Sequence, residues 1–76
     1  MQRSLSDIGR EIWQDWQPIS PYARPYVIAM RSLHSLDDMY GADSAKSVVL
    51  YFLANAQSWR GETARRVKAE LKGLVK

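Results

Sequence analysis

The sequence contains no cysteine and only one histidine, His34, in its 76 residues. Without cysteine the chain can form neither a disulfide framework nor a thiolate metal site. His34 has only Asp37 and Asp38 close to it in sequence, and a metal site needs three or four ligands at suitable spacing. We therefore expect no metal and no cofactor, and a fold that depends on packing in a reducing, cytoplasmic setting.

Long apolar runs are also absent. The longest run extends from Val48 to Ala54, far short of the roughly 20 residues that cross a bilayer. The N-terminal stretch MQRSLSDIGREIW is amphipathic and carries acidic residues, unlike a signal peptide. The sequence therefore predicts a soluble protein with no membrane partner.

No group of residues has the pattern of a catalytic centre. The chain has no glycine-rich phosphate loop, no nucleophile elbow and no pair of carboxylates with an acid–base partner. We therefore expect no catalytic residues, no small-molecule substrate and no enzymatic activity.

The composition that is present is that of a globular chain, with 46% hydrophobic and 25% charged residues. Residues 1–76 are long enough for one domain. A domain of this size buries only about 60% of the surface that its unfolded chain exposes. The core must therefore be small and densely packed.

Helical spacing marks two segments in the first half of the chain. Ser4 and Asp7 are spaced as an N-cap and its acidic partner. They predict a helix over 5–16 whose inner face carries Leu5, Ile8, Ile12 and Trp16. Three prolines then predict an ordered corner, and Pro25 suits the first position of a second helix that ends near His34. Its inner face would carry Tyr26, Ala29, Met30 and Leu33.

The most apolar segment predicts a central helix over 43–58. Asp43 is a good N-cap, and one face would carry Ala45, Val48, Val49, Phe52 and Ala56. Apolar residues on its other faces, among them Leu50, indicate a helix buried on all sides. The run VVLYFL also permits a strand, but no second strand candidate exists to pair with it. A single helical turn, with Ser35 and Asp38 spaced as a cap, fits the preceding segment.

A fourth helix begins at Gly61 or Glu62, with Ala64, Val67, Leu71 and Leu74 on its inner face. Glu62, Arg66 and Glu70 form an i,i+4 ladder on its outside. The complete pattern predicts an all-α fold, a compact bundle of about four short helices.

The C-terminal segment is strongly basic. Residues 60–76 hold six lysines and arginines against two glutamates, while residues 1–59 hold five basic and six acidic groups. Part of LANAQSWRGETARRVKAEL resembles a helix-turn-helix, although Gln57 and Ser58 depart from that motif. The residues that could contact nucleic acid or another acidic partner are Arg60, Arg65, Lys68, Lys72 and Lys76. A corner between two core helices with a solvated basic face explains the same pattern.

Several apolar positions fall outside the predicted core faces. Trp16 and Trp59 continue inner faces, whereas Trp13 lies to the side of its face. A protein this small cannot easily cover all of the off-face residues. The predicted protein-interaction residues are therefore Trp13, Val27, Ile28 and Leu50.

The segments SPYARPYVIAM, YGADS and YFLANAQSWRGETARRVKAEL resemble those of small uncharacterised proteins encoded by phages of actinobacteria. The resemblance implies a bacterial cytoplasm and a role in binding a host or phage macromolecule. Together with the off-face apolar residues it favours a non-catalytic interaction module that binds a protein or forms a homodimer. The alternative is a small helix-turn-helix-like DNA-binding protein that uses residues 60–76.

Overall fold

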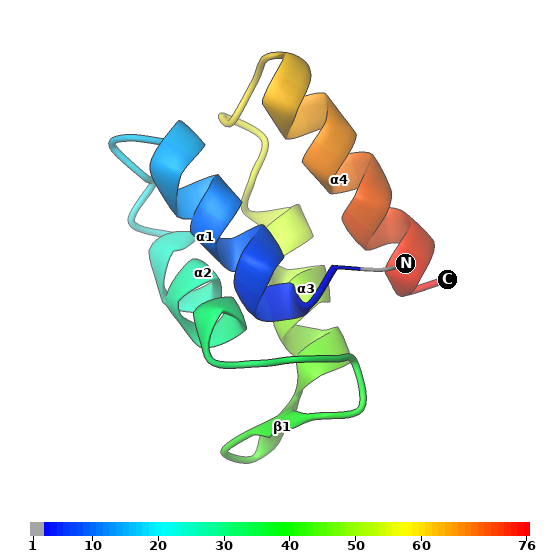
Figure 1. The fold of residues 1–76 in the computed structure, drawn as a ribbon. Helices are drawn as coiled ribbons and strands as arrows, with labels where there is room; N and C mark the ends of the chain where they lie inside the picture. The colour runs from blue at the N-terminus through cyan, green and yellow to red at the C-terminus, as the bar shows by residue number, and fades with distance from the viewer. Residues whose placement is uncertain (1–2) are drawn as a thin grey trace.

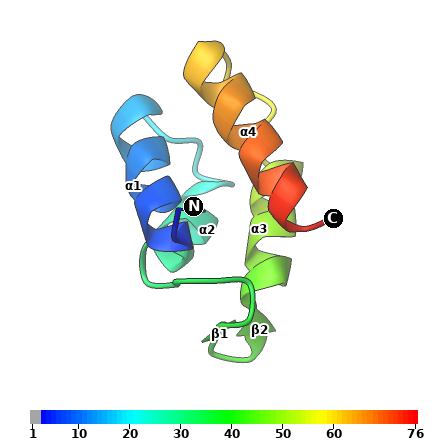
Figure 2. The same cartoon turned by 45° about the vertical axis from the view of Figure 1, so that its right-hand side comes forward.

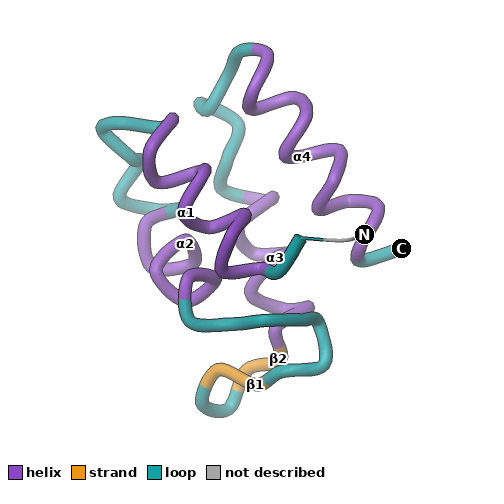
Figure 3. Tube along the Cα trace, in the orientation of Figure 1, coloured by secondary structure: helices purple, strands orange, loops and turns teal. Residues whose placement is uncertain are grey.

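Four α-helices and a short β-hairpin make up the computed structural model, which describes residues 3–76 (Figure 1). Their bounds are α1 Leu5–Asp15, α2 Arg24–Arg31, β1 Met39–Tyr40, β2 Asp43–Ser44, α3 Ala45–Ala54 and α4 Glu62–Leu74. The protein is therefore mostly helical, as the sequence predicts, with a two-stranded antiparallel sheet as an addition (Figure 3). Within residues 3–76, no helix has the length and apolar character needed to span a bilayer.

The helices surround one apolar core. α1 packs beside α2, α2 packs against α3, and α4 contacts α1. The hairpin lies at one end of the molecule, directly before α3 (Figure 2). Because each helix buries one face against its neighbours, the opposite faces of α2, α3 and α4 remain available at the surface.

α1 begins as the sequence predicts. The Ser4 hydroxyl accepts a hydrogen bond from the backbone N–H of Asp7 at 3.1 Å, which satisfies one of the free donors of the first turn. The apolar face of α1 is buried, and Gly9 allows α2 to approach closely. A Cβ atom at Gly9 would lie 3.1 Å from the backbone nitrogen of Arg31. The glycine that weakens the isolated helix thus permits the packing that stabilises it.

An aromatic cluster fills the centre of the core. The Trp16 and Trp59 rings stack with centroids 5.7 Å apart, and the fully buried Phe52 ring meets both edge-on at 6.3 and 6.2 Å. The indole N–H of Trp59 donates to Asp15 at 2.9 Å, so its polar atom is satisfied. The prediction that Trp16 and Trp59 belong to the core is confirmed.

The helical interpretation of VVLYFL is confirmed, but the bounds and the burial of this helix differ from the prediction. α3 covers residues 45–54 rather than 43–58. It begins later because Ser44 and not Asp43 is its N-cap, and the Ser44 hydroxyl accepts a hydrogen bond from the Ser47 N–H at 3.1 Å. Phe52 faces the core, whereas Leu50 and Tyr51 are 46% and 51% exposed. The expectation of a helix buried on all sides is wrong, since this side is covered only in part.

The segment before α3 forms a hairpin instead of a helical turn. Asp38 accepts hydrogen bonds from the backbone N–H groups of His34 and Ser35, at 2.8 and 3.3 Å, and so forms a turn. These bonds hold the pKa of the Asp38 carboxyl below its ordinary value. Gly41 then takes a positive φ of 61° in the tight connection between β1 and β2. Local hydrogen bonding therefore decides the shape of this segment.

α2 is shorter and more deeply buried than predicted. It covers residues 24–31 with Pro25 at its second position, and Val27 is fully buried. The assignment of Val27 to an exposed interaction site is therefore wrong. Contact with α1 on one side and α3 on the other widens the buried arc of α2 beyond a single stripe.

Candidate interaction surfaces

The apolar side of α3 that faces solvent forms one candidate surface. The Tyr51 ring lies 5.7 Å from the half-buried Tyr26 ring of α2, and Leu50 precedes Tyr51 on α3. We call these three residues the α3 apolar surface. The opposite side of α3 is fixed in the core by Phe52, so the surface is held on a rigid element. The sequence prediction included Leu50 but placed Tyr26 inside the core.

A second surface combines arginines with apolar side chains. The half-buried Trp13 of α1 lies beneath two guanidinium groups of α2, with Arg24 5.6 Å and Arg31 5.1 Å from its ring centroid. Ile28 is 44% exposed and stands on α2 between the two arginines, four residues after the first and three before the second. Trp13, Arg24, Ile28 and Arg31 are called the arginine surface below.

The charges of the arginine surface have no counter-ion within residues 3–76. Neither Arg24 nor Arg31 has a carboxylate within 4.0 Å in that range. A hollow of about 150 Å³ opens beside Trp13 and Arg24, lined also by Gln17, Pro18 and Ile19. The predicted Trp13 and Ile28 therefore lie together, and Arg24 and Arg31, which were not predicted, lie beside them. Their spacing of seven residues, two helical turns, was the signal that places them on one face.

The basic residues of α4 differ among themselves. Lys68 donates a hydrogen bond from Nζ to the Trp59 carbonyl oxygen at 2.6 Å and lies 6.0 Å from the Trp59 ring centroid. Burial lowers the pKa of the Lys68 ammonium, and the nearby charges of Lys72 and Arg60 lower it further. Lys68 therefore stabilises the connection before α4, and its contact with an acidic partner stays a prediction. The remaining predicted basic residues are exposed: Arg60, Arg65, Lys72 and Lys76.

The connection between α3 and α4 does not have the length of a helix-turn-helix turn. Residues 55–61 link the two helices, whereas the motif uses a turn of about three or four residues. Trp59 is buried in the connection, and Gly61 has a φ of 113° just before α4 begins. The segment is therefore a corner packed against the core.

An ion-pair network joins the start of the chain to α1 and α4. Arg3 contacts Glu11 at 2.7 Å and Glu70 at 2.6 Å, and Arg66 pairs with the second oxygen of Glu11. Burial opposes the charged form of Glu11, but hydrogen bonds from the two arginines outweigh it and lower the pKa of the carboxyl. The predicted Glu62–Arg66–Glu70 ladder is thus replaced by pairs between elements, because α1 brings Glu11 within reach of α4.

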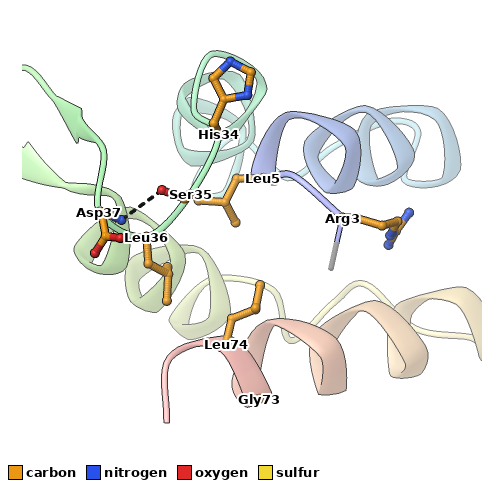
Figure 4. Close-up of a pocket in the computed structure, with 8 residues that line it drawn as sticks. All are labelled: Arg3, Leu5, His34, Ser35, Leu36, Asp37, Gly73 and Leu74. Atoms are coloured by element: carbon orange, nitrogen blue, oxygen red, sulfur yellow. Dashed lines mark hydrogen bonds between the residues drawn. The ribbon is translucent and has the colours of Figure 1, made fainter. Parts of the chain in front are cut away.

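A cavity of about 340 Å³ lies between the start of α1, the segment before the hairpin and the end of α4 (Figure 4). Three leucines, Leu5, Leu36 and Leu74, line it, while the His34 ring points away from them. Arg3 is bound to Glu11 and Glu70, so its guanidinium is already satisfied. The lining therefore lacks the converging polar groups that typify a catalytic or small-molecule site.

The described part of the chain also holds no group of three metal-ligating side chains, and His34 is exposed. Comparison with protein-family models, with curated proteins and with solved structures finds no match to this chain.

Proposed function

We propose that this protein is a non-catalytic interaction module that binds another protein through the α3 apolar surface. The observation that carries the proposal is the placement of Leu50 and Tyr51 at the surface of a helix whose opposite face anchors the core. Covering apolar surface is favourable by about 25 cal/mol per Å². A rigid, exposed apolar face loses little conformational freedom when it binds, which favours docking.

The partner we propose is a protein of the bacterial cytoplasm, a host or phage protein for which this chain serves as an accessory. Tyr26 and Tyr51 suit such an interface, since tyrosine offers both an apolar ring and a hydroxyl at its rim.

The test is affinity capture of the tagged protein from a nuclease-treated bacterial lysate, with two matched variants. Leu50→Lys places a charge in the α3 apolar surface, whereas Ala69→Lys places the same side chain at an exposed position of α4. We expect the wild type and Ala69→Lys to recover the same protein, and Leu50→Lys to lose it about tenfold or more. Equal recovery by Leu50→Lys, with unchanged folding by circular dichroism, would contradict the proposal.

DNA binding by α4 is a second candidate, favoured by the exposed and unpaired positions of Arg65 and Lys72 within residues 3–76. Each would neutralise a phosphate, so the double variant Arg65→Ala/Lys72→Ala should lower the salt dependence of duplex affinity by a slope of about two. Fluorescence anisotropy at several salt concentrations measures this slope. A duplex that binds wild type and double variant with the same slope argues against a role for α4.

A further inference from the structure

The hairpin carries the carboxylates that the arginines of the arginine surface lack. Tyr40 pairs with Asp43 across the two strands, so their side chains stand next to each other on one face of the hairpin. Tyr40 is 44% exposed and Met39 60% exposed. Neither Asp37 nor Asp43 has a cationic partner within 4.0 Å in residues 3–76. The hairpin end thus presents apolar side chains beside free carboxylates.

The arginine surface presents the converse arrangement. Arg24 and Arg31 lie seven residues apart on α2, about 10 Å along the helix. Ile28 lies between them on α2, and both guanidinium groups lie over the Trp13 ring. A binding partner would therefore combine an apolar or aromatic residue with acidic groups, as Tyr40 and Asp43 do on one face of the hairpin, with Asp37 two residues before β1.

We propose that the arginine surface of one copy of this chain docks the hairpin of a second copy. Carboxylates of the hairpin approach the guanidinium groups, and Tyr40 covers Ile28 and Trp13. This inference goes beyond the proposed function and does not depend on the α3 apolar surface. A nucleic acid would match the arginines equally well, but it gives no reason for the apolar residues beside them.

Each copy offers one docking surface and one hairpin. Two copies can therefore exchange both contacts about a two-fold axis, or further copies can continue head to tail. Exposed ion pairs contribute little individually and are screened by salt, so association should be weak and should decrease as ionic strength rises.

Complementary charge reversals test the contact directly. One variant is Arg24→Glu/Arg31→Glu, which reverses the charge of the arginine surface. The other is Asp37→Lys/Asp43→Lys, which reverses the charge at the hairpin. Each variant alone then sets like charges against each other. An equimolar mixture restores opposite charges at both kinds of contact. The hairpin of the lysine variant meets the arginine surface of the glutamate variant, and the unchanged hairpin of the glutamate variant meets the unchanged arginines of the lysine variant.

Sedimentation equilibrium between about 1 µM and 1 mM provides the measurement, a range that covers weak association. We expect the wild-type mass to rise with concentration, each variant to associate at least about tenfold more weakly, and the mixture to regain association. The control Arg65→Glu/Lys72→Glu makes the same charge change on α4 and should associate as the wild type does. Circular dichroism verifies that each variant is folded, and Arg24→Gln/Arg31→Gln replaces the glutamate variant if that one unfolds.

Three results would overturn the proposal. The first is a wild-type protein that stays monomeric over the full concentration range. The second is association of the charge variants at wild-type strength. The third is loss of association in both variants without recovery in the mixture, which would mean that the two surfaces do not meet each other. Capture of a nucleic acid or an unrelated acidic protein by a monomeric wild type would assign the arginine surface to that ligand instead. None of these results bears on the α3 apolar surface, which the Leu50→Lys experiment tests separately.

Discussion

Trp13 of α1 and Trp16, the C-cap residue of the same helix, are three residues apart, yet their surroundings are opposite. Trp16 stacks on Trp59 and meets the edge of Phe52 inside the core. Trp13 is half-buried and lies under the arginines of α2. The first arrangement stabilises the fold through buried apolar area and close packing. The arrangement around Trp13 leaves Arg24 and Arg31 without a carboxylate partner within residues 3–76. It contributes little to stability and leaves both charges free to bind a partner.

The largest loss of stability is expected from a substitution in the core around Trp16. Phe52→Ala should lower the free energy of unfolding by about 3–5 kcal/mol, because it opens a cavity beside the stacked tryptophan rings. Urea denaturation measures the change. Leu50→Ala on the exposed side of the same helix should cost about 1 kcal/mol or less. If the two substitutions had similar effects, the core would not be centred on Phe52.

The next effect concerns the close approach of α2 that places Arg31 beside Trp13. Gly9→Ala should destabilise the protein by about 1–2 kcal/mol although alanine favours helices, because the new Cβ meets backbone and side-chain atoms of Met30 and Arg31 at 3.1–3.2 Å. Gly73→Ala is the matched control. It lies in α4 with no atom within 4 Å of the new Cβ and should stabilise by up to about 1 kcal/mol. Thermal melting of both variants measures the difference, and stabilisation by Gly9→Ala would contradict the tight contact.

The smallest loss of stability is expected at Glu11, on the face of α1 where charges are paired. The lowered pKa of Glu11 means that its contribution to stability is complete above its ordinary value of 4.5 and is lost as the pH falls through the lowered folded-state value. Glu11→Gln should therefore cost about 0.5–1 kcal/mol at pH 7 and have little effect near pH 2. Denaturation as a function of pH measures this difference. The control Glu62→Gln makes the same chemical change at an exposed position of α4 that has no ion pair within residues 3–76.

Helix positions were predictable from the sequence where local signals agree. In α1 the Ser4 cap precedes apolar residues at helical spacing, and in α4 Gly61 does the same. The structure confirms both helices. The hairpin was not predictable in this way, because the same Ser35 and Asp38 that resemble a helix cap form a turn instead. Such side chains can satisfy either structure, and only the surrounding contacts distinguish them.

Surface assignments were predicted less well than helices. Ile28 and Leu50 are exposed as expected, whereas Val27 is buried and Lys68 is bound to the Trp59 carbonyl. A helical pattern gives the direction of each side chain on its own helix but not which other helices cover that direction. Three helices in contact can bury an arc much wider than one stripe.

The sequence by itself determined that four helices form and that the core contains Trp16 and Trp59, since capping, glycine and apolar spacing act over a few residues. Only the tertiary structure decided which charges are paired and which remain free. Glu11 and Arg66 are 55 residues apart and meet between α1 and α4, and Trp13 meets Arg31 between α1 and α2. The physical reason is that ion pairs and cation–π contacts act over a few ångströms in space, and separation along the chain does not reveal that distance.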